Sequence, residues 1–358
     1  MAYLVWNAPL RMLSLTAALG LGAATSAAAG SPPTDPATSA KNAAAVVEFD
    51  KAGAKTSKPY RIAYLTECVD NPYCVTRLNA IKEAAGKFGV QVKVFDAQWS
   101  LVNEAKALQN AAAEGFDGYL FGPLAAQPSC SSWKRSLAPT GKPVVSVTVP
   151  MCGDADHTPG LAATFTMQGA AHYQELADAA FSSCDKPCKS IVIGGFIGSD
   201  LQRYWETANR QVAAKYPNVT IAAMEAANFD PRIAMRKTQD ALLAHPDATV
   251  IVSNWDDMTR GIEQGVTAAG KKPGVDLKIY SAGANKDALE RVRNGSIEAS
   301  MALRPYEEGY YATVALIMAM EGKPLNGYVD EADLPGLKDI LGSVIVTKDN
   351  AAKFQAKY

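Results

Sequence analysis

The stretch "TECVDNPYC", residues 66–74, gathers side chains that can bind a small molecule. Glu67 offers carboxylate oxygens, Asn71 offers an amide donor and acceptor, and Tyr73 adds an aromatic ring with a hydroxyl. These residues follow 60–65, whose apolar alternation is typical of a buried strand. Ligands of open α/β sheets bind outside the carboxyl ends of the strands. We therefore predict that Asn71 and Tyr73 contact a ligand.

Asn71 also has a purely structural interpretation. Pro72 follows it, and the apolar residues of 75–88 recur at helical spacing. Asparagine is favoured at the N-cap of a helix, and proline at the first helical position. From the sequence alone, Asn71 could bind a ligand or simply cap this helix.

The six cysteines predict disulfides rather than metal ligands, because we expect the chain to be exported. Spacing favours one bond across the first turn and one within "CDKPC", which leaves a third pair, so the expected bonds are Cys68–Cys74, Cys184–Cys188 and Cys130–Cys152. Free buried thiols are the alternative. We expect no metal site, because no histidine has the spacing to a cysteine pair that zinc sites show; the histidines are His157, His172 and His245.

The first 59 residues predict an export signal followed by a tether. Arg11 precedes an apolar run, and small residues follow near Ala29, which fits a signal peptide over 1–29. Residues 30–59 mix Pro, Ser, Thr and Ala without a sustained period, which indicates an N-terminal arm or loosely packed linker. We expect a protein free in the periplasm, with secretion into the medium as the alternative.

Strand and helix patterns alternate over the remaining chain in two series. The expected strands of the first series are 60–65, 90–95, 118–121 and 144–147; those of the second are 191–194, 219–224, 250–253 and 278–280, and two late strands follow at 296–303 and 342–347. Two βα series predict an α/β protein of two Rossmann-like lobes, each with a parallel sheet.

The late strands predict a hinge with three crossings, because the chain must return to lobes that are already built. We expect these crossings near 162–166, 302–305 and 337–341. Lobe 1 then comprises 60–163 plus 304–338, and lobe 2 comprises 164–303 plus 339–358. A cleft between lobes is a common ligand site.

The composition gives no sign of a nucleic-acid partner. The chain has 35 Lys and Arg against 36 Asp and Glu, so its net charge is close to zero. Enzyme motifs are missing too: the glycines of "IGGFIGSD" do not have dinucleotide-binding spacing, and no nucleophile elbow or phosphate-binding loop occurs. We expect neither an enzyme nor a cofactor.

Several motifs in order make the chain resemble the type I periplasmic binding proteins, in particular the ribose- and galactose-binding group that serves ABC importers. The motifs are "NPYC", "EAAGKFGVQVKVFDAQW", "GKPVVSV", "NFDPRIAMRKTQDALLAHPDATVIVSNWDDM" and "VRNGSIEASMAL". The resemblance covers nearly all of the expected mature domain. It implies a monomeric receptor that binds a small cyclic solute between its lobes and presents it to a permease in the inner membrane.

The resemblance also implies the residues of the ligand site. The implied residues are Thr66, Glu67, Asn71, Tyr73, Cys74 and Thr148 on the first lobe, and Arg203, Trp205, Phe229, Asn254, Trp255 and Asp256 on the second. Phe229 and Trp205 have a core-packing interpretation as well. Sugar binders of this group usually carry charged or amide side chains where this chain has Thr148, Gly283 and Leu303, and an arginine at Trp205. Compared with those sugar binders, the chain therefore has fewer charged or amide side chains to bind ligand hydroxyls and more aromatic side chains.

The larger number of aromatic side chains in the implied site leaves a second function open. The chain also resembles the accessory proteins of trimethylamine-oxide sensing, which present a ligand-dependent surface to a membrane histidine kinase. In that interpretation, the cleft is an aromatic cage for a soft cation, formed by Tyr73, Trp205, Phe229 and Trp255.

Overall fold

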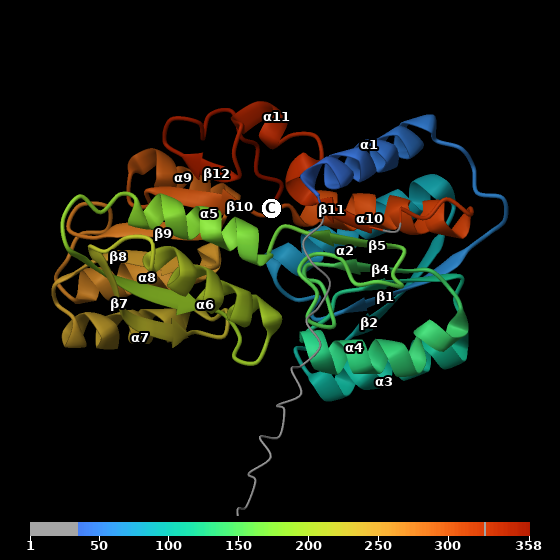
Figure 1. The fold of residues 1–358 in the computed structure, drawn as a ribbon, viewed down its shortest axis with the longest axis horizontal. Helices are drawn as coiled ribbons and strands as arrows, with labels where there is room; N and C mark the ends of the chain where they lie inside the picture. The colour runs from blue at the N-terminus through green and yellow to red at the C-terminus, as the bar shows by residue number, and fades with distance from the viewer. Residues whose placement is uncertain (1–34, 326) are drawn as a thin grey trace, which may run out of the picture.

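The computed structural model describes residues 35–325 and 327–358 and has two six-stranded sheets side by side along the long axis of the molecule (Figure 1). The expected signal peptide, 1–29, lies outside the described residues. None of the helices in the described ranges has the length and apolar character needed to cross a membrane. The structure confirms the predicted class of two α/β lobes with mostly parallel sheets.

The first sheet has the strand order β11-β5-β4-β3-β1-β2, and all its neighbouring strands are parallel. Its strands are β1 (Arg61–Thr66), β2 (Gln91–Asp96), β3 (Gly118–Phe121), β4 (Val144–Val147), β5 (Ala163–Thr166) and β11 (Gly327–Asp330). Its helices are α1 (Pro36–Ala52), α2 (Pro72–Phe88), α3 (Leu101–Glu114), α4 (Ala126–Ser136) and α10 (Pro305–Met320), with the 3-10 turns η1 (Ala138–Thr140) and η2 (Glu331–Asp333).

The second sheet has the order β12-β10-β9-β8-β6-β7, in which only β12 runs antiparallel to its neighbour. Its strands are β6 (Cys188–Gly194), β7 (Val219–Ala226), β8 (Ala248–Ser253), β9 (Lys278–Gly283), β10 (Ala299–Ala302) and β12 (Ile345–Thr347). The helices of this half are α5 (Ala170–Phe181), α6 (Asp200–Ala213), α7 (Pro231–Ala244), α8 (Asp256–Ala268) and α9 (Lys286–Asn294), and α11 (Lys338–Leu341) precedes β12.

Strand β1 shows why these segments fold as buried strands. Ile62 and Tyr64 belong to the core beneath α2 and α10, whereas Ala63 and Leu65 belong to the core beneath α3 and α4. All four side chains are at most 1% exposed. Because successive side chains of a strand point to opposite faces, a strand between two helix layers is apolar throughout.

The predicted loose arm over 30–59 is wrong for 36–52, which form α1. This helix packs against β11 and α10 (Figure 1). Its buried face is Ser39, Asn42, Ala43 and Val46, a helical i, i+3, i+4, i+7 spacing. The Asn42 amide donates to the carbonyl of Tyr328 at 3.0 Å. Small and polar residues on the buried face hid the amphipathic pattern.

Three segments connect the two sheets. The chain passes from β5 to α5, from β10 to α10, and from β11 through η2 and α11 to β12. The expected first crossing at 162–166 needs correction: residues 163–166 are β5, fully inside the first sheet, so lobe 1 extends beyond residue 163 and the crossing follows Thr166. The segment "ATFT" has two threonines and lacks the apolar run by which β3 and β4, strands of the same length, were predicted.

Candidate functional site

A cavity lies between the two lobes, at the carboxyl ends of strands from both sheets. Its free volume is about 40 Å³, room for a few water molecules, since one water needs roughly 10–15 Å³. Its lining residues are Glu67, Asn71, Tyr73, Cys74, Trp99, Thr148, Gln168, Leu201, Phe229, Asn254, Trp255 and Leu303. The structure thus brings together eight of the twelve residues implied by the sequence, and adds Trp99, Gln168, Leu201 and Leu303.

A buried arginine organises the first-lobe wall. Arg77 is fully buried; its Nη2 lies 2.6 Å from Oε1 of Glu67, and its Nη1 lies 3.4 Å from Oε2 of Glu308. Its Nε donates to the Tyr64 hydroxyl at 2.6 Å, and Nη1 also donates to Thr148 Oγ1 at 2.5 Å. One guanidinium therefore holds two carboxylates, which would otherwise be buried charges without a countercharge.

Sequence analysis did not identify Arg77. Its signal was its position: Arg77 stands one helical turn after Tyr73 on α2, so the two side chains share a face. Burial raises the pKa of Glu308, and the Arg77 charge opposes that shift.

Tyr73 connects this network to the cavity. Its hydroxyl donates to Oε2 of Glu308 at 2.7 Å and accepts from Nε2 of Gln168 at 3.0 Å. Burial raises the pKa of the Tyr73 hydroxyl, and the neighbouring Glu308 carboxylate raises it further, so the phenol stays protonated. The hydroxyl therefore donates to and accepts from protein groups, and Tyr73 also lines the cavity.

Both interpretations of Asn71 agree with its geometry. Its Oδ1 accepts from the backbone N–H of Cys74 at 2.9 Å, which caps α2. Its amide nitrogen has only a contact with Cys68 Sγ at 3.5 Å. Asn71 also lines the cavity, so its amide hydrogens remain available there.

Asn254 and Trp255, which follow β8, form the polar and aromatic parts of the second-lobe wall. Asn254 is 2% exposed, and neither its amide nitrogen nor its oxygen has a hydrogen-bond partner. A buried polar group without a partner is costly and rare in folded proteins. Among the side chains that line the cavity, Asn254 alone has both polar atoms buried without a partner, which makes it the strongest candidate there for binding a ligand.

Three aromatic rings run across the cleft from one lobe to the other. The Trp99 ring, from the first lobe, lies 5.4 Å from the Phe229 ring, which in turn lies 5.6 Å from the Trp255 ring at 89°. Such tilted and edge-to-face arrangements are the favoured ones for aromatic pairs. The rings make the cavity largely apolar on one side.

Three lining residues have left-handed backbone conformations. The φ angles are 56° at Trp99, 72° at Thr148 and 57° at Phe229. Non-glycine residues in this region are uncommon and cost of order 1 kcal/mol or more each. Such strain concentrates where a side chain must be aimed at a ligand, and here all three side chains line the same cavity.

Four of the residues implied by the sequence do not line the cavity. Trp205 is fully buried and packs edge-to-face on Tyr173 at 5.2 Å, which is its core-packing interpretation. Arg203 turns to Asp200, with Nε 2.7 Å from Oδ1. Their positions on α6 explain this. Trp205 lies on the buried face of the helix, whereas the side chain of Arg203 is half exposed.

Thr66 and Asp256 do not line the cavity but hydrogen-bond to segments that support its walls. The Thr66 hydroxyl donates to the carbonyl of Cys68 at 3.0 Å, within the turn that carries the site. Asp256 accepts from the backbone N–H of Asn285 at 3.1 Å and from the Ser300 hydroxyl at 2.9 Å. Burial raises the pKa of Asp256 to about 6.

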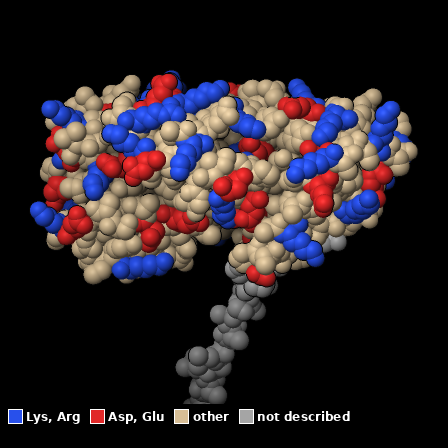
Figure 2. Space-filling view, turned by 90° about the horizontal axis from the view of Figure 1, so that it is seen from above, with Lys and Arg blue, Asp and Glu red and all other residues tan. Residues whose placement is uncertain are grey.

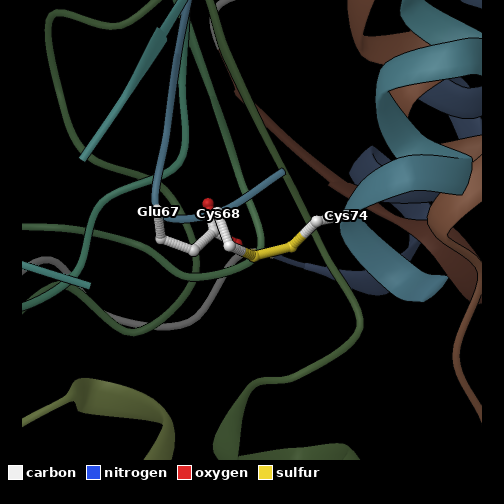
Figure 3. Close-up of side chains that lie close together, drawn as sticks. All are labelled: Glu67, Cys68 and Cys74. Carbon is white, nitrogen blue, oxygen red and sulfur yellow. A yellow bond between two sulfur atoms is a disulfide. The ribbon is translucent and has the colours of Figure 1, made fainter. Parts of the chain in front are cut away.

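The structure confirms the three predicted disulfides, which are Cys68–Cys74, Cys130–Cys152 and Cys184–Cys188. The first lies beside Glu67 at the cavity (Figure 3), and donor atoms of these three residues lie within 4.8 Å of one another. The sulfurs are not thiolates, and Glu67 already accepts from Arg77. This cluster therefore forms a wall of the cavity rather than a metal centre.

Known proteins resemble the chain over most of its length. The ribose import binding protein of Bacillus subtilis (strain 168) is 24% identical over 267 residues, which cover 74% of this chain and 83% of that protein. The galactofuranose-binding protein of Escherichia coli (strain K12) is 22% identical over 236 residues, covering 64% of this chain and 73% of that protein.

Solved structures agree on the fold, and a family model agrees on the family. The Caulobacter myo-inositol binding protein bound to myo-inositol has a TM-score of 0.73 at 21% identity, covering 84% of this chain and 98% of that one. A galactofuranose binding protein has a TM-score of 0.72 at 20% identity, covering 82% and 97%. The family model described as periplasmic binding protein domain matches residues 62–324. The chain therefore belongs to the periplasmic binding protein family, with the type I fold, and is a solute-binding protein rather than an enzyme.

Proposed function

We propose that this chain is a periplasmic receptor of an ABC importer, which closes its two lobes around a small cyclic, sugar-like solute. The observation that carries the proposal is Asn254, a buried amide on the cavity wall with neither end hydrogen-bonded. A ligand hydroxyl or ether oxygen would satisfy it. Relatives named for ribose import and for galactofuranose binding support the solute class.

The aromatic wall supports a cyclic ligand. Rings such as Phe229 and Trp255 offer apolar faces on which the C–H face of a ring-shaped solute can stack. The amide of Asn71 faces the same cavity from the other lobe. A solute held between Asn71 and Asn254 contacts both lobes and so favours the closed arrangement.

The size of the cavity supports a closing mechanism. About 40 Å³ of free volume is too little for a ring-sized solute, since ligand pockets usually measure roughly 300–1,000 Å³. Three connections cross between the sheets, and such connections can act as hinges. The lobes therefore separate for entry and close around the solute in a wider arrangement than this one, which excludes water and strengthens the polar contacts.

The remaining parts of the proposal concern place and partners. We place the receptor in the periplasm as a monomer, with a permease of the inner membrane as its partner. Basic and acidic side chains are interspersed over the face drawn in Figure 2, in keeping with a near-neutral chain that has no nucleic-acid partner.

A thermal-shift screen tests the proposal. The purified chain is melted with pentoses, hexoses in furanose form and inositols, since a ligand that binds the native state raises the melting temperature. Each hit is then titrated into Asn254→Leu and, as a matched control, Asn209→Leu. Asn209 is another fully buried asparagine with an unpartnered oxygen, but it lies outside the cavity. We expect binding to weaken at least tenfold in Asn254→Leu alone; equal affinity in both variants would refute the proposed site.

A further inference from the structure

A second cavity adjoins the ligand cavity at the connections between the lobes. Its free volume is about 220 Å³, and residues of two connections line it, among them Arg304 and Pro335. Leu303 lines both this cavity and the ligand cavity. The two cavities are therefore neighbours, and we call the second one the hinge cavity.

The side chain of Tyr358 stands between the two cavities. It lines the hinge cavity, and its ring meets the ring of Tyr73, which lines the ligand cavity, edge to face with 5.9 Å between the centroids. The Tyr358 hydroxyl donates to the carbonyl of Gly283 at 3.0 Å, and the backbone N–H of Leu303 donates to the same carbonyl at 3.0 Å. Tyr358 and Leu303 together separate the ligand cavity from the hinge cavity.

Gly283 leaves the space that the Tyr358 hydroxyl occupies. A Cβ atom at position 283 would lie 3.1 Å from this hydroxyl oxygen and closer still to Oδ2 of Asp256. The φ angle of Gly283, 141°, also lies in the region that favours glycine. A larger residue at 283 would therefore displace Tyr358 or Asp256.

Tyr358 is attached to the second lobe. Besides the bond to Gly283, at the end of β9, its backbone oxygen accepts from the N–H of Lys286, where α9 begins, at 3.0 Å. The neighbouring Lys357 reaches the first lobe, where its Nζ lies 3.0 Å from Oε1 of Glu307, but an ion pair of a half-exposed lysine contributes little. Figure 1 marks this C-terminal end of the chain between the lobes. When the lobes separate, the Tyr358 ring therefore stays with the second lobe.

Tyr358 limits how far a solute extends toward the hinge. Separation of the lobes widens the ligand cavity between its two walls, but the ring that closes its hinge end moves with one of those walls. We infer that Tyr358 is a specificity-determining residue of this receptor, whose ring ends the ligand site at the hinge and excludes solutes that carry a second ring in that direction. The inference rests on the proposed function and concerns the same site.

Removal of the ring would join the two cavities. Together with the space that the Tyr358 side chain takes, cavities of about 40 and 220 Å³ approach the lower end of the usual range for ligand pockets, which is roughly 300–1,000 Å³. The hinge cavity also has a polar lining, which includes Glu307, Lys353, Gln355 and Lys357. Such side chains suit a hydroxylated substituent, for example a second sugar ring.

Titration calorimetry of the full chain and its Tyr358→Ala variant tests the inference. The solutes are myo-inositol and D-galactose, and the two-ring solutes galactinol, melibiose and lactose, in which galactose is joined to a second ring in three different ways. We expect Tyr358→Ala to bind at least one of the two-ring solutes about tenfold or more tightly than the natural chain does, because the steric barrier is gone.

Three further variants identify the cause. Tyr358→Phe keeps the ring and should show no gain, whereas Tyr358→Leu keeps only part of the volume and should show a smaller gain than Tyr358→Ala. Tyr216→Ala is the matched control, because Tyr216 is also partly buried in the second lobe, donates to Oδ1 of Asp178 at 2.8 Å and lines neither cavity. It should bind every solute as the natural chain does. If Tyr358→Ala does not fold, Tyr358→Leu decides.

The outcomes separate this inference from the proposed function. If a solute of the thermal-shift screen binds the natural chain but neither truncation of Tyr358 gains affinity for a two-ring solute, the role of Tyr358 is wrong while the cleft receptor stands. An equal gain in Tyr358→Phe or Tyr216→Ala would also overturn it, because the ring would not be the barrier. If no sugar or inositol binds the natural chain or any variant, both proposals fail.

Discussion

Closure of the lobes should depend on Asp200, which caps a helix of the opposite lobe. Helix α4 of the first lobe begins after Ala125, which provides no side-chain cap. The Asp200 carboxylate, from α6 of the second lobe, accepts a hydrogen bond from the backbone N–H of Ala126. From the same helix, the Tyr204 hydroxyl donates to the carbonyl of Asp154 in the first lobe at 3.3 Å. Asp200→Ala removes the first of these interlobe bonds.

The expected size of this effect follows from helix capping. Loss of a side-chain cap costs about 0.5–2 kcal/mol, and a carboxylate at a helix N-terminus adds roughly 0.3–1 kcal/mol through the helix dipole. A total of about 1–2 kcal/mol shifts the open–closed equilibrium roughly 5- to 30-fold. Where the ligand needs the closed state and that state is not fully populated, the apparent affinity falls by up to the same factor.

Titration calorimetry with the tightest solute from the screen measures this loss, and a second substitution identifies its cause. Arg203→Met is the matched control, because it removes the partner of Asp200 within α6 and leaves the bond to Ala126 in place. It should cost much less affinity than Asp200→Ala does. An equal loss in both variants, or no loss in either, would refute the capping argument.

Three further predictions concern stability and are measured by chemical denaturation. Arg77→Met should destabilise the chain by about 3–5 kcal/mol, because it leaves two buried carboxylates without their cation. The control Arg203→Met removes a half-exposed ion pair and should cost at most about 1 kcal/mol. Burial raises the pKa of Glu104 to about 7, so the native state holds this proton more tightly than the unfolded chain does. The stability that Glu104 contributes is therefore fully present below pH ~4.5 and is lost as pH rises through ~7. The free energy of unfolding should change by about 3 kcal/mol over this range, and Glu104→Gln should abolish the change. Replacing both cysteines of Cys130–Cys152 by serine should cost roughly 3 kcal/mol, against roughly 2 for Cys184–Cys188, because the sequence separations are 22 and 4.

Each of these predictions has a result that contradicts it. Equal stability losses in the two arginine variants would mean that the buried network is not the reason for the loss. A natural chain and a Glu104→Gln variant with parallel stability curves from pH 4.5 to 7 would contradict the raised pKa. A larger loss from the shorter disulfide loop would contradict the loop-entropy argument.

The sequence predicted elements best where one pattern filled a whole segment. Strands β3 and β4 have the predicted bounds, since both are runs of apolar residues buried on two faces. Strands β5 and β11 have the same length but include polar residues, as in "ATFT" and "GYVD", and gave no such signal. Helix α1 was missed because its buried face includes serine and asparagine, whose partners lie almost 300 residues away in the chain, as in the Ser39–Asp333 bond.

The site was predicted where residues directly follow a strand, as Asn254 and Trp255 do after β8. Trp99 was not predicted as a site residue, because it follows β2 through a left-handed turn that no sequence period indicates. Gln168 lies on a crossing, where lobe packing alone decides which side chains face inward. Trp205 shows the reverse error, because a tryptophan on an amphipathic helix looks the same whether it faces a core or a ligand.

The most direct test of the central claim is the distance between the lobes with and without ligand. Val102 and Ile197 are 63% and 71% exposed, on the first and second lobes, near the Trp99–Phe196 contact between them. Spin labels on cysteines at these positions report that distance by double electron–electron resonance. The account predicts a broad or long distribution for the free chain that shortens to one narrow distance with the tightest solute from the screen. A distribution that saturating solute leaves unchanged would contradict closure around a ligand.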